Sequence, residues 1–276
     1  MRCRVLLALM MGCMIAQPAL AQIPGLGDIG GAISKIKKTT DDTARVAKGV
    51  TGLSLEEEVA IGDAVAIAIV VRYGGVWRDG PATRRVNLIG RILAQYATRQ
   101  DLEWRFGLLN SDAINAFSAP GGRVFITRGL YELMPNDEVL AGVLAHEIIH
   151  IDQRHAISTI ERGELLGGAS GLLADNSASF AQFEQVVGKV ANEILDQGYD
   201  PGTEYESDEG GRDLAAVSGF APGGLRAALI QIDSINGQSV EVLSTHPPIE
   251  SRLERLPEDP LPATPAPANY ATEEPA

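Results

Sequence analysis

The stretch LAHEIIHIDQRHAI (residues 144–157) contains three of the four histidines in the chain. Positions four apart on an α-helix differ by only about 40°, so His146 and His150 should share one helix face. Two neutral imidazoles at this spacing can supply two of the nitrogen ligands that Zn2+ favours. Glu147 points away from that line, where it can act as a general base on a metal-bound water. The stretch therefore predicts a buried helix that carries half of a metal site.

The third histidine of the stretch is predicted to stay outside this site. His155 follows His146 by nine residues, which places it about 180° around a continuous helix. The longer three-histidine zinc pattern also fails, because Gln153 stands where it requires glycine and Ala156 where it requires histidine. Unless the helix breaks, we expect His155 to be a surface or helix-end residue.

A catalytic zinc needs a third protein ligand, which a glutamate on a separate helix can provide. An acid one turn after that glutamate can orient a ligand histidine. After His150, two glutamates are followed by aspartate four residues later: Glu204 with Asp208, and Glu209 with Asp213. The spacing alone leaves both pairs open.

Composition limits the partners and the destination of the chain. Its 276 residues carry 23 Lys+Arg and 36 Asp+Glu, a formal net charge of −13, which argues against nucleic acid as a partner. Residues 1–21 are predicted to be a signal peptide, with Arg2 and Arg4 before an apolar run and a cleavage site after Ala21. The alternative is a loose lipobox, MMGC, that would anchor the chain by lipid at Cys13.

The rest of the chain divides into three segments. Residues 22–54 are expected to be flexible, residues 55–256 to form the folded domain, and residues 257–276, rich in Pro, Ala and Glu, to be a disordered tail. Helices are predicted over residues 55–71, 81–99, 202–219 and 222–235, besides the one with the histidines. EWRFGLLN (residues 103–110) and GRVFITRG (residues 122–129) are predicted strands on either side of a hairpin turn. The glycine-rich LLGGASGLL (residues 165–173) suits a lid, a membrane- or client-binding patch, or ordinary helix packing.

Three segments together resemble one protein family. The stretch NAFSAPGGRVFITRGLYELMPNDEVLAGVLAHEIIHIDQRHA (residues 115–156) is similar to the core of the HtpX and CAAX prenyl protease family of zinc metallopeptidases, especially its periplasmic BepA-like branch. EYESDEGG (residues 204–211) resembles the family's Glu-x-Glu-Ala-Asp-x-x-Gly motif, and STHPPIESRLERL (residues 244–256) its His-Pro segment. The resemblance covers residues 55–256. We expect neither the spanning helices of the family's integral-membrane members nor the repeat domain of longer BepA-like proteins in this chain.

The resemblance implies a fold and a ligand set. The expected fold is α+β: a mainly helical, zincin-like domain with a small antiparallel sheet beside the histidine helix. One Zn2+ per chain would be held by His146, His150 and Glu204, with Asp208 orienting a histidine from behind. Ser207 replaces the family's usual alanine, and the motif glycine falls on Gly211.

The resemblance also implies roles for residues around the metal. The segment Asn115-Ala116-Phe117 would pair with substrate backbone, although plain core packing is an equal interpretation of Phe117. His246 would approach the metal's open position, either stabilising the transition state or inhibiting the resting enzyme, and Arg252 would anchor that segment or contact the site.

The expected function is that of a periplasmic zinc endopeptidase. It would hydrolyse peptide bonds in misfolded or misassembled cell-envelope polypeptides, with peripheral membrane contact as a further expectation. The alternative is a zinc-bound periplasmic chaperone or adaptor whose protease activity is latent or self-inhibited.

Overall fold

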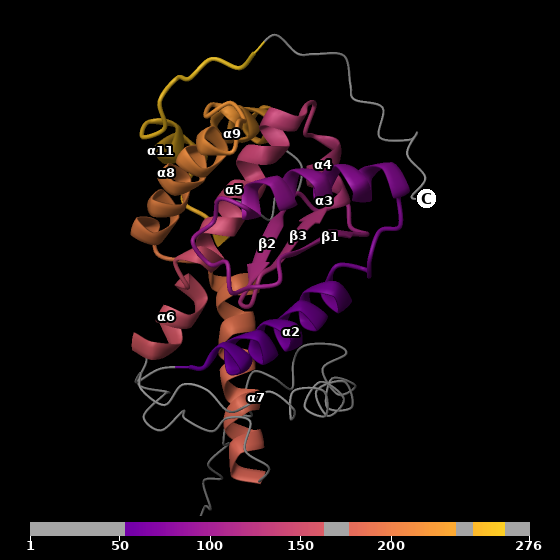
Figure 1. The fold of residues 1–276 in the computed structure, drawn as a ribbon, viewed down its shortest axis with the longest axis vertical. Coiled ribbons are helices and arrows are strands. Elements are labelled where there is room, and N and C mark those ends of the chain that lie inside the picture. Colours follow the sequence, from indigo (N-terminus) through magenta and orange to yellow (C-terminus); the bar gives the residue numbers. More distant parts are fainter. Residues whose placement is uncertain (1–52, 163–176, 236–244, 263–276) are drawn as a thin grey trace, which may run out of the picture.

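The computed structural model describes residues 53–162, 177–235 and 245–262, and these residues form an α+β fold with a small sheet among helices (Figure 1). The predicted signal peptide, nearly all of the segment 22–54, LLGGASGLL and the end of the tail lie outside the described residues. The elements in chain order are α2 (Leu55–Arg72), α3 (Gly80–Ala94), β1 (Arg105–Leu109), β2 (Ala116–Ala119), β3 (Arg123–Thr127), α4 (Arg128–Glu132), α5 (Asp137–Asp152), α6 (His155–Arg162), α7 (Ser177–Asn192), the π-helix η3 (Glu193–Gln197), α8 (Pro201–Val217), α9 (Gly224–Ser234) and α11 (Ile249–Leu253).

The sheet is mixed, which corrects the antiparallel sheet expected from the sequence. Its strand order is β1-β3-β2, with β3 antiparallel to β2 and parallel to β1. The residues between the two predicted strands form a strand of their own, and a turn containing Gly121 (φ 73°) and Gly122 (φ 90°) returns the chain antiparallel. β2 takes one side of β3, so β1 pairs with the other side and runs parallel.

The sheet separates two hydrophobic clusters. Val124 and Ile126 belong to the cluster shared with α3, α5 and α9, whereas Phe117 and Ala119 belong to the cluster shared with α2 and α7. This alternation follows from the two-residue repeat of a β-strand. In Figure 1, α3 and α5 accordingly lie on one side of the strands and α2 on the other.

The helix with the histidines, α5, is the central element. Every residue from Val139 to Asp152 is buried, as expected for a helix that is apolar on most of its circumference. Asn136 caps its first turn by accepting a hydrogen bond from the Val139 amide, 3.0 Å away. The helix contacts α3, α8, α9 and the sheet, so its position is fixed from several directions.

The ends of the first two helices are fixed by specific hydrogen bonds. Ser54 and Glu57 form a capping box at the start of α2. The second helix ends at Ala94 instead of Arg99, because the Thr98 and Arg99 amides donate to the Asp152 carboxylate at the end of α5. Among the described residues, no helix is both long and apolar enough to cross a membrane.

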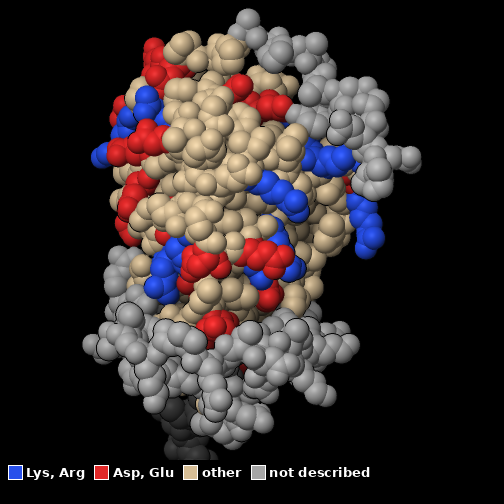
Figure 2. Space-filling view, in the orientation of Figure 1, with Lys and Arg blue, Asp and Glu red and all other residues tan. Residues whose placement is uncertain are grey.

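Charged side chains of both signs are interspersed on the face shown in Figure 2. They surround a broad region without charge in the upper and middle part of that face. The acidic balance of the whole sequence is therefore not gathered into one continuous patch on this side of the molecule.

Candidate metal centre

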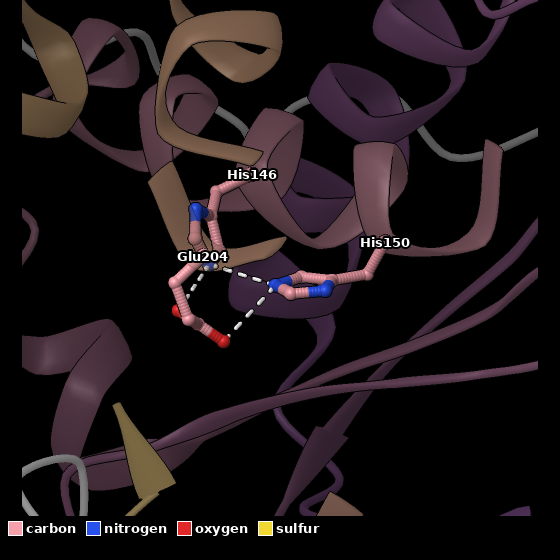
Figure 3. Close-up of side chains that lie close together, drawn as sticks. All are labelled: His146, His150 and Glu204. Atoms are coloured by element: carbon pink, nitrogen blue, oxygen red, sulfur yellow. Dashed lines mark hydrogen bonds and ion pairs between the residues drawn. The ribbon is translucent and has the colours of Figure 1, made fainter. Parts of the chain in front are cut away.

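Three buried side chains from two helices converge on one point. His146 and His150 lie one turn apart on α5, and Glu204 comes from the first turn of α8 (Figure 3). The Nε2 atoms of the histidines are 3.1 Å apart, and each lies 3.6 Å from one oxygen of the Glu204 carboxylate. The predicted three residues are thus brought together by the fold.

The donor atoms fit one metal ion. Three ligands of a tetrahedral ion at bond lengths of 2.0–2.2 Å lie about 3.3–3.6 Å from one another, close to the separations observed here. Both carboxylate oxygens of Glu204 are buried without a hydrogen-bond partner among the described residues. Burying two imidazoles that face each other beside such a carboxylate costs folding free energy, unless a cation binds between the three side chains. His146, His150 and Glu204 are therefore a candidate metal site.

The Glu147 carboxylate lies beside this site and is almost fully buried. Burial raises the pKa of its carboxyl group, which the positive character of His146 and a hydrogen bond from Ser118 partly offset. A carboxylate whose pKa lies above its ordinary value is suited to take and return a proton near neutral pH. Sequence reasoning placed Glu147 here but did not identify Ser118, which lies on β2 and has no recognisable motif.

Behind His146, Asp208 and Arg252 form a buried ion pair. The His146 Nδ1 lies 3.0 Å from an Asp208 oxygen, and Arg252 donates to both Asp208 oxygens at 2.6 and 2.9 Å. Burial alone would raise the pKa of Asp208, but these hydrogen bonds hold it well below its usual value. Arg252, predicted only as a possible site residue, anchors the acid that orients His146.

His246 reaches the same centre from the segment before α11. Its Nε2 lies 3.6 Å from Glu204, and its Nδ1 lies 3.0 Å from the Thr245 hydroxyl. Potential ligand atoms of His146, Glu147 and His246 lie within 4.8 Å of one another. Gly198 permits this approach, since it has a φ of 74° and a Cβ there would lie 1.9 Å from the Thr245 carbonyl oxygen.

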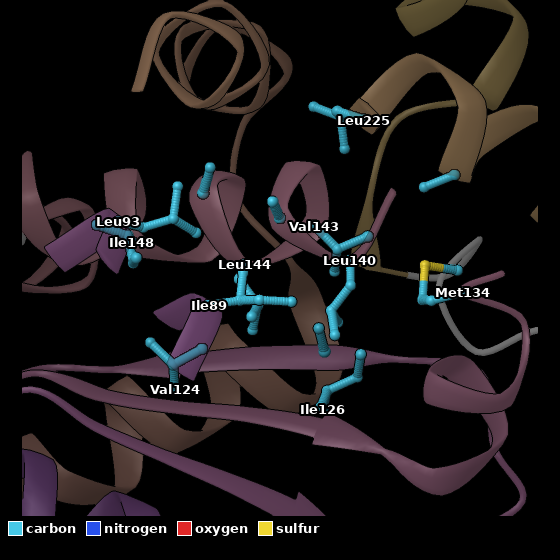
Figure 4. Packing of buried hydrophobic residues seen from close by; sticks show 14 of the residues in the cluster. Ile89, Leu93, Val124, Ile126, Met134, Leu140, Val143, Leu144, Ile148 and Leu225 are labelled. Atoms are coloured by element: carbon cyan, nitrogen blue, oxygen red, sulfur yellow. The ribbon is translucent and has the colours of Figure 1, made fainter. Parts of the chain in front are cut away.

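The position of α5 is fixed by the side of the helix that faces away from the metal site. Leu140 and Leu144 point away from α8 toward Val124 and Ile126 on the strands, with Ile89 of α3 between them (Figure 4). Because such interiors are close-packed, the histidine side of α5 is held against α8 with little freedom.

The structure places His155 at a helix end, one of the two expected positions, but buried and not at the surface. The helix breaks after Asp152: Arg154 has a φ of 57°, and a new helix, α6, begins at His155. The break turns His155 inward, where it is buried with its Nδ1 3.0 Å from the Nδ1 of His150. Sequence reasoning also missed Tyr199, whose ring stacks on His150 with centroids 4.5 Å apart.

The predicted substrate-binding segment lies at the start of the edge strand β2, with Asn115 immediately before the strand. Ala116, Phe117 and the rest of this strand are buried, and the Phe117 ring packs on Tyr73 with centroids 4.6 Å apart. The Phe117 side chain therefore belongs to the core, which leaves only its backbone for a substrate.

A pocket extends from this segment along α5 and α9. Polar and site residues form one part of its lining, namely Asn115, Ala116, His146, Glu147, His246 and Arg252. The other part is aliphatic, formed by Leu130, Val143, Leu225, Ala228, Leu229 and Ile232. Its aliphatic composition suits an apolar side chain next to Glu147.

Comparison with known proteins agrees with this arrangement. Residues 82–259, more than half of the chain, match the profile of peptidase family M48. The chain belongs to this family. M48 members are metallopeptidases, so the family accounts for a metal centre of the kind that His146, His150 and Glu204 can form.

Individual relatives in family M48 share less than 30% sequence identity with this chain over the aligned residues. The chain is 29% identical over 213 residues to the beta-barrel assembly-enhancing protease of Yersinia pestis, covering 73% of this chain and 43% of the relative. It is 28% identical over 240 residues to the protein of that name from Escherichia coli K12, covering 83% and 48%. It is 26% identical over 185 residues to the mitochondrial metalloendopeptidase OMA1 of Schizosaccharomyces pombe, covering 64% and 53%. The chain thus spans about half the length of these relatives.

Proposed function

We propose that this M48 chain is a zinc-dependent endopeptidase that cleaves misfolded or misassembled cell-envelope polypeptides. The observation that carries the proposal is a buried set of two imidazoles and one carboxylate with a second carboxylate, Glu147, beside it. Zinc held by His146, His150 and Glu204 would supply Lewis-acid polarisation of the scissile carbonyl and acidify the attacking water.

The chain's own residues would move the proton and hold the ligands. Glu147 takes a proton from the attacking water and delivers it to the leaving amine, a role suited to its burial and raised pKa. Asp208, fixed by Arg252, keeps the proton of His146 on Nδ1 and so leaves Nε2 free for the metal. His246 lies close enough to contact the same position.

The surroundings of Glu147 support an extended polypeptide as substrate. Backbone pairing with β2, through Asn115, Ala116 and Phe117, would bind a chain with little sequence preference. The aliphatic pocket would take an apolar side chain, which unfolded proteins expose. Relatives named beta-barrel assembly-enhancing proteases support an envelope client and a periplasmic location, reached through the signal peptide at residues 1–21 or with a lipid anchor at Cys13. Peripheral contact with the membrane belongs to the same proposal.

The test combines metal content with cleavage of casein as an unfolded client. Wild-type protein should contain about one Zn2+ per chain and cleave casein. The Glu147→Gln variant should retain the metal and lose at least a hundredfold in cleavage rate, consistent with the usual contribution of a general base. Cleavage by Glu147→Gln at the wild-type rate would contradict the mechanism, and absence of metal from wild type would contradict the centre.

A second candidate is a zinc-bound chaperone or adaptor with latent protease activity. Two observations favour it: His246 lies against the metal site, and all four residues of β2 are buried. The His246→Ala variant separates the two candidates. Faster casein cleavage by this variant would indicate a self-inhibited protease, whereas client binding without cleavage by either protein would indicate the chaperone.

A further inference from the structure

The two histidines of the metal site have different partners behind them. His146 is backed by the Asp208 carboxylate, as is common for metal ligands. His150 is backed by another imidazole, since its Nδ1 lies 3.0 Å from the Nδ1 of His155. Nothing in the sequence motifs assigns a role to His155, which lies outside the pattern of ligands and general base.

The direction of the hydrogen bond follows from the geometry of the site. The Nε2 of His150 faces His146 and Glu204, so a metal there requires the lone pair of that atom. A neutral imidazole then has its proton on Nδ1, and His150 must donate to His155. The Nδ1 of His155 is consequently an acceptor, and the proton of its neutral ring lies on Nε2.

The tautomer in which the Nδ1 of His155 is the acceptor also agrees with the groups around the rest of the ring. Its Nε2 lies 3.6 Å from a carboxylate oxygen of Glu206, a side chain that is 60% exposed. The Ser207 hydroxyl lies 3.4 Å from the Nδ1 of His155. A carboxylate near Nε2 favours a proton there, and Nδ1 is then the acceptor that faces His150.

We propose that His155 is a positioning residue for the metal: it accepts a hydrogen bond from His150 and thereby fixes the tautomer and ring plane of that ligand, with Glu206 orienting His155 from the surface. This inference rests on the metal centre of the proposed function. His150 thus has a histidine–glutamate pair behind it, in the place that the buried Asp208–Arg252 pair takes behind His146.

The turn that places His155 is itself anchored. The Nε of Arg154 lies 3.2 Å from Glu58, and Asp152 accepts hydrogen bonds from the Thr98 and Arg99 amides. These contacts tie the two sides of the break between α5 and α6 to α2 and to the loop that follows α3. On the other side of His150, the Tyr199 ring stacks at an interplanar angle of 21°. The ring is thereby held at its face by Tyr199 and at its edge by His155.

The experiment measures zinc affinity of the full chain by competition with a chromophoric chelator. Replacing His155 by Leu should weaken zinc binding by about 10–100-fold, the usual effect of removing a ligand's outer partner. His155→Gln retains a carbonyl acceptor and should recover a large part of the loss. Glu206→Gln should have a smaller effect in the same direction, a few-fold, because the carboxylate is exposed and acts through His155.

A second readout follows the tautomer directly. With four histidines in the chain, 15N-histidine labelling gives a spectrum in which each ring can be assigned by its substitution. Zinc-loaded wild type should show a slowly exchanging Nδ1–H for His150, and His155→Leu should lose its protection from solvent exchange. A purely structural role of His155 would lower the thermal stability of the metal-free protein and leave both zinc affinity and this signal unchanged.

The matched control is Ile157→Ala, which removes a buried side chain from the same helix where it packs in the cluster with α2 and α7. It should destabilise the fold by about 2–5 kcal/mol while zinc affinity stays within twofold of wild type. His155→Leu with zinc affinity within twofold of wild type would overturn the inference and leave the proposed function standing. Wild-type protein that binds no zinc would instead overturn the proposed function.

Discussion

At the scale of single residues, the metal site depends on groups that do not face the metal. Arg252 is 3% exposed and pairs with a carboxylate that is equally buried. Buried ion pairs contribute little net stability when intact, but breaking one leaves an uncompensated charge in the interior. The pair therefore constrains the sequence even though it lies behind the reacting atoms.

Replacing Arg252 by Met should lower the free energy of unfolding by about 3–5 kcal/mol, because Asp208 would be left buried without its cation. Urea denaturation measures this loss. The control is Arg212→Met, which breaks an ion pair with Asp259 near the surface and should cost about 1 kcal/mol or less. Equal losses in the two variants would contradict the structural role assigned to Arg252.

Zinc affinity should fall as the pH is lowered through neutrality. Burial raises the pKa of Glu204 to about 7 in the metal-free protein, so at lower pH this ligand retains a proton that the metal must displace. Competition with the Glu204 proton alone weakens binding by about tenfold per pH unit below 7. Although burial opposes it, the pKa of His146 is also raised, by hydrogen bonding to Asp208, so its proton can only steepen the fall. Chelator competition between pH 5.5 and pH 8 checks the slope. An affinity that is constant over this range would show that the Glu204 carboxylate is not a ligand.

At the scale of elements, the site requires the backbones of α5 and α8 to lie very close to each other. A Cβ on Gly211 of α8 would lie 2.8 Å from the amide nitrogen of His146, and nothing flexible could move aside. At Gly210, by contrast, a Cβ would meet only side-chain atoms of Ile149, at 3.2 Å or more. The two neighbouring glycines therefore have different functions in the packing of α8 on α5.

Gly211→Ala should separate α8 from α5 and move Glu204 relative to the histidines. The expected result is a loss of about 1–3 kcal/mol in unfolding free energy, typical of overpacking, together with weaker zinc binding. Gly210→Ala is the matched control, and alanine's higher helix propensity there offsets the contact with Ile149. Calorimetry and zinc titration of both variants test this difference. Full zinc affinity in Gly211→Ala would refute the close approach.

Part of the site and part of the fold could be predicted from the sequence. The helix spacing of His146 and His150 and the glutamate–aspartate spacing after them limited the third ligand to two pairs, and the family resemblance selected Glu204. The break at Arg154 could not be predicted, because a left-handed arginine has no glycine or proline to signal it. The mixed sheet was missed for a similar reason: β2 is four residues long, and its pairing depends on tertiary contacts.

At the scale of the whole molecule, the metal site links parts of the chain that are distant in sequence. Its candidate ligands lie on α5 and α8, His246 comes from the segment before α11, and Arg252 lies on α11 itself. α5 is packed against both the sheet and α8. A metal held by both helices therefore closes the fold across its centre, and its binding energy adds to stability.

Removal of zinc should consequently lower the melting temperature of the whole domain. Free zinc at a thousandfold excess over its dissociation constant adds about 4 kcal/mol, which corresponds to roughly 10 °C for a domain of this size. Calorimetry with and without a chelator measures the shift. In Glu204→Gln, chelation should have a much smaller effect. The metal-free variant should also be more stable than metal-free wild type above pH 7, where the buried wild-type carboxylate is charged and accepts no hydrogen bond from the described residues. Equal sensitivity of both proteins to the chelator would mean that zinc stabilises the fold at some other place.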